Sequence, residues 1–248
     1  MTANKAFIVS LFFLQFALVA CEDNSLFDAG EVETREHLLG DNLDLIEVLD
    51  IFDIVLVTDT VNKVIVTCGS NLHSNVNIYK ESGTLFLENT ENNRWTRQYE
   101  KIKLSVHLVN IPPIYARSPI KVTSTDTLQT EYFHFIDWSK FSDVDVTIDV
   151  KSFQLWVSHD NFGSYTIRGK SENTYINCWA TASVKTDELI SQSCTVVHKG
   201  IANITVRVVT NLTVSLESRG NIYYYGSPSS ILIENRLSTG MLIEVKDN

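Results

Sequence analysis

Three aspartates at alternating positions are the first side chains in this 248-residue chain that suggest chemistry. In an extended strand Asp143, Asp145 and Asp149 would share one face, because alternate side chains point the same way. Such a row could bind Ca²⁺ or, with a basic residue such as Arg168, act as a lyase on an acidic sugar. Glycoside hydrolysis would need two carboxylates about 5–9 Å apart, one of them with a raised pKa. We favour a solvated strand face whose charges discourage edge-to-edge association.

Imidazole and thiol side chains recur 19 and 20 residues apart at His159, Cys178 and His198. Both groups are zinc and copper ligands, and stacked strands would bring them into one column. The next position in that column is Leu216, which favours ordinary packing with the imidazoles hydrogen-bonded to backbone. We therefore predict no metal and no cofactor.

Aromatic residues at outward positions are the candidate ligand-binding residues. Tyr223 and Tyr225 alternate with the inward Ile222, and Trp156 and Trp179 alternate with inward apolar neighbours. Aromatic faces on a rigid sheet stack on sugar rings or anchor a protein partner. Partial burial of these rings against loops is the alternative interpretation.

Enzyme motifs and nucleic-acid signals are missing from the sequence. There is no Gly-rich phosphate loop, no His-Glu-x-x-His, no Gly-x-Ser-x-Gly and no Cys-x-x-Cys. The net charge of −10 argues against sequence-independent nucleic-acid binding, which needs clustered Lys and Arg. We predict a protein that is not an enzyme and does not bind nucleic acid.

A repeat must position these side chains. Four β-branched residues, which we use as anchors, lie 19, 20 and 18 residues apart: Val157, Ile176, Val196 and Val214. Six places after each anchor comes a small residue, and the next place holds Ser or Asn: Ser164, Ser183, Asn203 and Asn221. A period near 20 with a fixed turn predicts a β-solenoid in which the Ser/Asn column holds the coils together. Strict alternation at 101–109 predicts a strand, and no long amphipathic helix is visible, so the fold class is all-β.

The first residues predict export. Residues 1–20 combine Lys5 with a short apolar run, which is typical of a signal peptide. The run ends in Leu18-Val19-Ala20-Cys21, which resembles a bacterial lipobox and implies lipidation at Cys21. Residues 21–48 are acidic and predict a tether with a helical turn near 31–39, ahead of a folded domain at 49–248.

Several segments resemble the head GIN domain of auto-transporter adhesins, a family of bacterial envelope proteins. The resemblance rests on Gly83-Thr84-Leu85-Phe86-Leu87, on Ser118-Pro119-Ile120-Lys121-Val122 and on the closing stretch Gly220–Pro228. It implies a right-handed β-solenoid with two packed sheets per coil and brings no catalytic residues. The aromatic stretch Tyr132–Ser142 departs from the pattern and is interpreted as an insertion.

The resulting functional hypothesis is a lipid-anchored protein of the bacterial cell envelope, at the outer membrane, that binds a glycan or another envelope protein. A carbohydrate-active β-helix enzyme and a periplasmic scaffold or signalling protein are the alternatives. The periplasmic or surface face, the ligand and the oligomeric state stay open. So does pairing of Cys178 with Cys194, because an oxidising compartment permits one disulfide among the three cysteines beyond Cys21.

Overall fold

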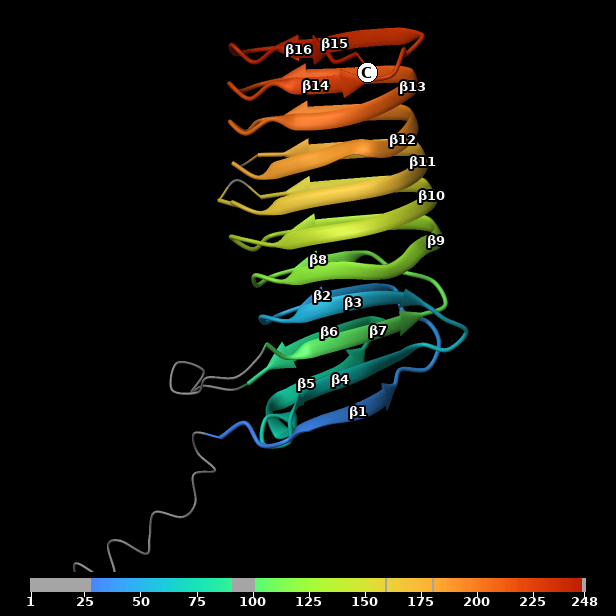
Figure 1. Ribbon diagram of the computed structural model, residues 1–248, viewed down its shortest axis with the longest axis vertical. Helices are drawn as coiled ribbons and strands as arrows, with labels where there is room; N and C mark the ends of the chain where they lie inside the picture. Colours follow the sequence, from blue (N-terminus) through green and yellow to red (C-terminus); the bar gives the residue numbers. More distant parts are fainter. Residues whose placement is uncertain (1–27, 91–100, 159, 180, 247–248) are drawn as a thin grey trace, which may run out of the picture.

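The computed structural model describes residues 28–90, 101–158, 160–179 and 181–246. Strands stack along the long axis of the molecule, with β1 near one end and β15 and β16 at the other (Figure 1). The predicted signal peptide and Cys21 lie outside the described residues. The described part contains no helix with the length and hydropathy needed to cross a bilayer.

The N-terminal strands pair in both parallel and antiparallel orientations. They are β1 (Val32–Leu38), β2 (Leu45–Val48), β3 (Asp53–Thr58), β4 (Lys63–Gly69), β5 (Val76–Glu81), β6 (Thr84–Asn89), β7 (Lys103–Leu108) and β8 (Ile114–Ala116), with a 3-10 turn at His73–Asn75. β4 pairs antiparallel with both β1 and β7, and β3 then pairs parallel with β7 and β9. The helical turn predicted near 31–39 is wrong, because β1 occupies that stretch. Within the predicted tether, Ile46 and Val48 of β2 are buried in the core.

The later strands are parallel, with local register shifts in several of the pairs. They are β9 (Lys121–Asp137), β10 (Asp143–Val157), β11 (Ser164–Cys178), β12 (Ser183–His198), β13 (Ile204–Leu216), β14 (Ile222–Tyr225), β15 (Ser230–Arg236) and β16 (Leu242–Glu244). β9 to β13 pair consecutively, and β14 and β15 both pair with β13. The fold is the predicted β-solenoid, with about 20 residues per coil.

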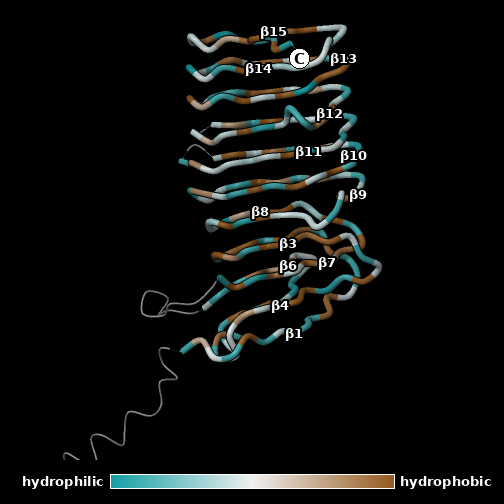
Figure 2. The backbone as a smooth tube through the Cα atoms, in the orientation of Figure 1, coloured by the Kyte–Doolittle hydropathy of each residue, from teal (hydrophilic) through white to brown (hydrophobic). Residues whose placement is uncertain are grey.

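Each long strand bends in its middle and so supplies two legs of a coil. In β10 the buried positions run from Val144 to Val150 on even numbers and then from Phe153 to Val157 on odd numbers. The change from even to odd buried positions at 151–152 marks the bend, and it lets the inward side chains of both legs point into one shared core. Apolar and polar residues alternate along the tube accordingly (Figure 2). Each coil therefore buries two inward rows, which neighbouring coils extend into a continuous core.

The register corrects two sequence interpretations. Leu155, not Val157, is the partner of Ile176, so the first anchor was misaligned by two residues. The stretch Tyr132–Ser142 is not an insertion, because Phe133 and Phe135 of β9 pair with Phe153 and Leu155 of β10. The polar Asp137 takes the inward position that Val157 takes in the next coil, which hid this coil from the apolar pattern.

The predicted Ser/Asn column does hold the last coils together at its two asparagines. The backbone N–H of Asn221 donates to Asn203 Oδ1 at 3.2 Å, and that of Met241 donates to Asn221 Oδ1 at 3.0 Å. Each side chain thus satisfies a backbone donor on the following coil.

Candidate functional site

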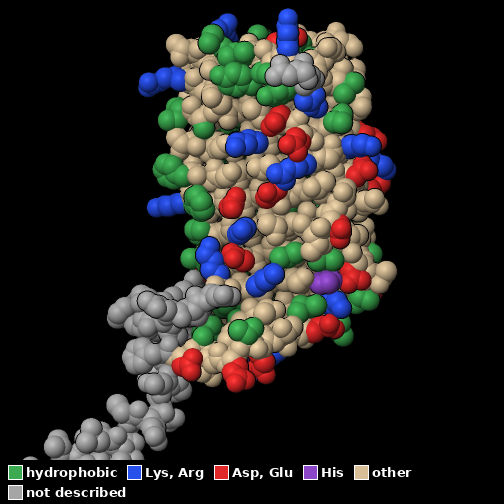
Figure 3. Space-filling model, viewed as in Figure 1, with side chains coloured by type: hydrophobic (Ala, Val, Ile, Leu, Met, Phe, Trp, Pro, Cys, Tyr) green, Lys and Arg blue, Asp and Glu red, His purple; other side chains and the backbone are tan. Residues whose placement is uncertain are grey.

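An apolar groove of about 290 Å³ opens where β9, β10 and β11 end. We call it the tryptophan groove and define it by its lining residues: Ile136, Asp137, Trp138, Trp156, Val157, Ser158, Asn177 and Trp179. The three tryptophans are 59%, 41% and 46% exposed, in chain order. Hydrophobic side chains gather at several heights along the left edge of Figure 3, where the loops between coils lie in Figure 1.

The strand register positions the three indoles. Trp138, Ser158 and Trp179 each follow directly the last residue of a strand, and those last residues are register partners. Their backbone N–H groups continue the ladder, donating to the carbonyls of Ala116, Asp137 and Val157. Trp138 and Trp179 are therefore equivalent positions two coils apart, with the small Ser158 between them. Trp156 comes from the middle coil and pairs with Ile136 and Asn177.

Two of the rings are held by neighbouring side chains. The Trp156 ring lies against Tyr175, with centroids 5.3 Å apart and planes 40° apart. The Lys199 ammonium lies 4.0 Å from the centroid of the Trp179 ring, a cation–π contact from the next coil. These contacts restrict the ring rotamers and lower the entropy that a ligand would have to remove on binding.

The polar groups beneath the groove differ in whether they are satisfied. Asp137 is buried, and its two oxygens accept hydrogen bonds from the Ser139 N–H at 2.7 Å and the Tyr165 hydroxyl at 2.6 Å. Burial, reinforced by the Asp137 charge, raises the pKa of Tyr165 well above its usual range. Asn177 is only 7% exposed, and its Oδ1 has no hydrogen-bond partner in the described structure.

The four aromatic residues predicted from the sequence do not form one site. The structure brings Trp156 and Trp179 together in the groove. Tyr223 and Tyr225 lie on β14, which pairs with the first half of β13 and is remote from the groove. The guanidinium carbon of Arg207 lies 5.2 Å from the centroid of the Tyr225 ring. Trp138 was missed because it lay in the supposed insertion, and only the register of β9 against β10 reveals it.

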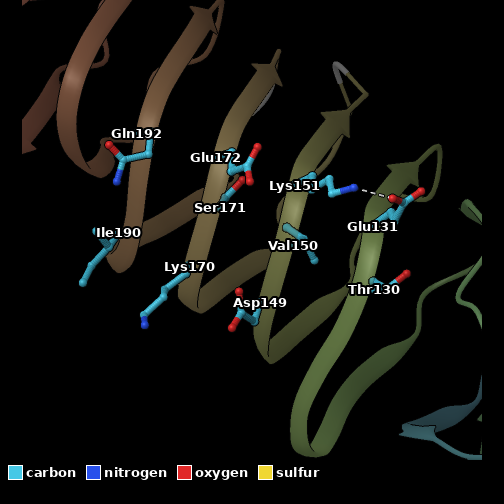
Figure 4. Close-up of a pocket in the computed structure, with 10 residues that line it drawn as sticks. All are labelled: Thr130, Glu131, Asp149, Val150, Lys151, Lys170, Ser171, Glu172, Ile190 and Gln192. Carbon is cyan, nitrogen blue, oxygen red and sulfur yellow. Dashed lines mark hydrogen bonds and ion pairs between the residues drawn. The ribbon is translucent and has the colours of Figure 1, made fainter.

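The aspartate row is split between two environments. Arg168 pairs with Asp145 and, at 3.2 Å, with Glu188, so the base that lyase chemistry requires is held between two carboxylates. Asp149 instead lines a polar hollow of about 480 Å³ at the bends of β9 to β12 (Figure 4). There Lys151 pairs with Glu131 at 2.5 Å, and this contact raises the pKa of Lys151. The hollow is lined mainly by polar and charged side chains, among which Lys151 and Glu131 form an ion pair.

The column weighed as a metal site in the sequence is made up of different residues in the structure. Cys178 pairs in register with Val157 and His198, and His159 lies outside the described residues. His198 Nδ1 accepts from the Gly200 N–H at 3.3 Å and Nε2 donates to the Ala202 carbonyl at 2.7 Å. Burial lowers the pKa of His198 and so favours the neutral ring, whose two hydrogen bonds hold the turn after β12. No group of three His, Cys, Asp or Glu suited to a metal occurs in the described part of the chain.

The described cysteines are not disulfide-bonded. Cys68, Cys178 and Cys194 are buried, and none of them forms a disulfide with another described cysteine. Burial raises the pKa of Cys194 to about 12, which keeps it a thiol at neutral pH. Cys178 and Cys194 therefore pack as small hydrophobic side chains of the core.

Comparison with solved structures agrees with this architecture. A putative adhesin from Bacteroides fragilis matches with a TM-score of 0.75 at 14% identity, covering 87% of this chain and 97% of that one. A putative adhesin from Parabacteroides distasonis matches with a TM-score of 0.58 at 17% identity, covering 87% and 98%. A protein of the same organism described as a putative lipid binding protein matches with a TM-score of 0.54 at 14% identity, covering 87% and 97%. At such identities the likeness concerns the fold alone.

Comparison with curated proteins gave no match. The family model described as "Putative auto-transporter adhesin, head GIN domain" matches residues 42–228, which include the tryptophan groove. This chain belongs to the family of putative auto-transporter adhesin head GIN domains.

Proposed function

We propose that this protein is a non-catalytic adhesion protein of the bacterial envelope, anchored through Cys21, whose solenoid presents the tryptophan groove to a glycan or protein partner. The observation that carries the proposal is the convergence of Trp138, Trp156 and Trp179 from consecutive coils into one apolar groove. Exposed apolar surface of this kind, on a rigid scaffold, is the usual form of a binding site. Membership of an adhesin-like family supports the same conclusion.

Catalysis is the weaker candidate on the same surface. The Asp145–Arg168–Glu188 ladder neutralises the charges that a lyase would direct at its substrate. Among the described residues, one carboxylate lines the tryptophan groove, that of Asp137, and both of its oxygens already accept hydrogen bonds from the protein. The groove therefore offers binding contacts without a pair of reactive carboxylates.

Adhesion is tested with cells that express the full-length protein. We expect the double variant Trp138→Ala/Trp179→Ala to reduce retention on mucin- or collagen-coated surfaces by at least about tenfold, as expected for removal of two central aromatic anchors. Tyr79→Ala is the matched control, because Tyr79 is 42% exposed and stacks on Phe86 but lies far from the groove on β5. Equal retention of the wild type and the double variant would contradict the proposal.

The lipid anchor and the side of the membrane that the solenoid faces are tested separately. We expect Cys21→Ala to abolish metabolic labelling by palmitate and to release the protein from the membrane fraction. Labelling that persists in this variant would remove the lipoprotein assignment. Protease treatment of intact cells should digest the solenoid if it faces outward, with a periplasmic protein as the protected control.

A further inference from the structure

We propose that two copies of this chain dock through their C-terminal ends, where β16 of each copy pairs antiparallel with β15 of the other. The inference goes beyond the proposed function and does not depend on the tryptophan groove. Three features of this end carry it: a core that is left uncovered, a step between the two legs of the last coils, and opposite charges without ion-pair partners among the described residues.

The core of the solenoid is uncovered at the C-terminal end of the described structure. Ile231 and Ile233 of β15 are 44% and 43% exposed. Their register partners on β13, Leu212 and Val214, are 1% and 0% exposed in the same inward rows. No described strand pairs with the outer edges of β15 and β16, which lie at the end of the stack (Figure 1). This end therefore exposes apolar side chains together with unpaired backbone N–H and C=O groups.

The opposite end of the stack is protected against such pairing. No described strand pairs with the outer edge of β1 either, but this strand carries charged side chains at Glu33, Arg35 and Glu36. Charges on an edge strand discourage pairing with another chain. In β15 the charges are confined to the last three positions and follow an exposed apolar run at 231–233. The C-terminal end is therefore the better suited of the two for association.

The two legs of the solenoid end at different heights, which makes the C-terminal end a step. β15 is stacked on the second leg of β13, while β14 and then β16 are stacked on the first leg. The first leg therefore extends one strand further than the second. A two-fold axis that runs midway between the legs exchanges them, so the raised leg of one copy meets the recessed leg of the other. Each β16 then fills the recess beside β15 of the other copy, which makes the end self-complementary.

The same symmetry fixes the direction and the register of the new strand pairs. The strands turn back at their bends (Figure 4), so β16 would run antiparallel to β15 of the other copy. Rotation about this axis leaves each residue at its own position along the axis. Leu242 and Arg236 continue the two ends of β13, one on each leg. Leu242 of one copy would then lie opposite Arg236 of the other, and Ile243 opposite Asn235.

Opposite charges would meet across this contact. Arg236 and Glu244 are exposed, and neither forms an ion pair with a described residue of its own chain. In the proposed register Glu244 is two residues along β16 from Leu242, which lies opposite Arg236 of the other copy. Such diagonal neighbours are within reach of long side chains. The two-fold axis forms the Arg236–Glu244 pair twice, so the charge pattern favours a second copy over an unrelated strand.

Cysteine cross-linking tests the register in cells that express the full-length protein. Two differently tagged variants, Asn235→Cys and Ile243→Cys, are co-expressed and oxidised. We expect a disulfide-linked dimer that carries both tags, and no dimer from either variant alone. Asn211→Cys, which is exposed on β13 away from the proposed contact, is the matched control in place of Asn235→Cys. Absence of the mixed dimer, dimers of Asn235→Cys alone, or cross-linking of Ile243→Cys to a different protein would overturn the inference.

Charge exchange tests the contact with purified full-length protein in detergent. The end face is small compared with the interfaces of permanent dimers, so we expect sedimentation velocity to show a weak, concentration-dependent dimer. Arg236→Glu and Glu244→Arg should each raise the dissociation constant by about tenfold, because two opposite-charge pairs become like-charge pairs. The double variant should restore the dimer while circular dichroism stays unchanged. A wild type that stays monomeric, or a double variant as weak as the single ones, would overturn the inference.

Discussion

The two edges of the regular coils share one backbone period and differ in how their polar groups are held. The loop edge, formed by the turns that follow β9 to β12, contains buried side chains that bond the backbone of adjacent turns. Asn161 is fully buried, donates to the Ser139 carbonyl at 3.1 Å and accepts from the Gly163 N–H at 2.6 Å. At the surface of the bend edge, formed by the bends inside the same strands, lies the exposed ion pair Lys151–Glu131, above a buried hydrogen bond between the Thr174 and Ser191 hydroxyls at 2.8 Å.

This difference teaches where a precise site can form on a solenoid. Buried hydrogen bonds fix side chains because breaking one leaves an unsatisfied group away from water. Exposed ion pairs between long side chains fix little, because water and salt compete with them. The tryptophan groove lies at the loop edge, beside Asp137, and so inherits a rigid support.

The largest effect is expected at Asp137. Asp137→Ala would leave the Tyr165 hydroxyl and the Ser139 N–H without their acceptor beneath the groove, so we expect a loss of about 2–4 kcal/mol in the free energy of unfolding. Chemical denaturation measures it. Asp149→Ala at the exposed bend edge is the matched control and should change stability by less than about 0.5 kcal/mol. Equal losses for the two variants would erase the distinction between the edges.

A second prediction concerns pH. Burial lowers the folded-state pKa values of His198 and His134 below 6.5, so the unfolded chain takes up protons more readily than the folded one. Their contribution to stability is therefore complete above about pH 6.5 and is lost as the pH falls, by at most about 1.4 kcal/mol per pH unit for each ring.

His198→Gln isolates the loop-edge share of this effect, because the amide can replace both hydrogen bonds of the neutral ring. We expect the free energy of unfolding to decline less in this variant between pH 7.5 and 5 than in the wild type. Parallel declines would show that His198 is not kept neutral by the fold.

The smallest effect is expected at the bend edge itself. Lys151 and Glu131 have side chains about 60% exposed, so Lys151→Ala should leave the midpoint of thermal unfolding nearly unchanged. Thermal unfolding of wild type and variant in low and high salt measures this. A clear drop in the unfolding midpoint that disappears in high salt would give the bend edge a structural role that we do not expect.

The sequence was sufficient to predict a solenoid but not to align the equivalent residues of consecutive coils. Inward residues of the coils are apolar at a fixed period, which predicted the solenoid. A leg carries two consecutive inward positions, however, and Leu155 and Val157 are both apolar, so a shift by two residues preserves the pattern. That shift placed His159, rather than Val157, in the column of Cys178.

Only part of the tryptophan groove could be predicted from the sequence, for a related reason. Parity identified Trp156 and Trp179 as outward-facing, but their convergence depends on which positions are equivalent in consecutive coils. Trp138 was hidden because a buried Asp137 looks polar in the sequence, and its partner Tyr165 is 28 residues away. No local pattern records a hydrogen bond between coils.

The two-coil separation of Trp138 and Trp179 has an evolutionary consequence. A solenoid grows by duplication of whole coils, and duplication outside β9 to β11 would leave the groove unchanged. Duplication of the β10 coil would instead move the outer indoles apart by one strand spacing, about 4.8 Å. The span of the groove would thus change in discrete steps of one coil rather than continuously.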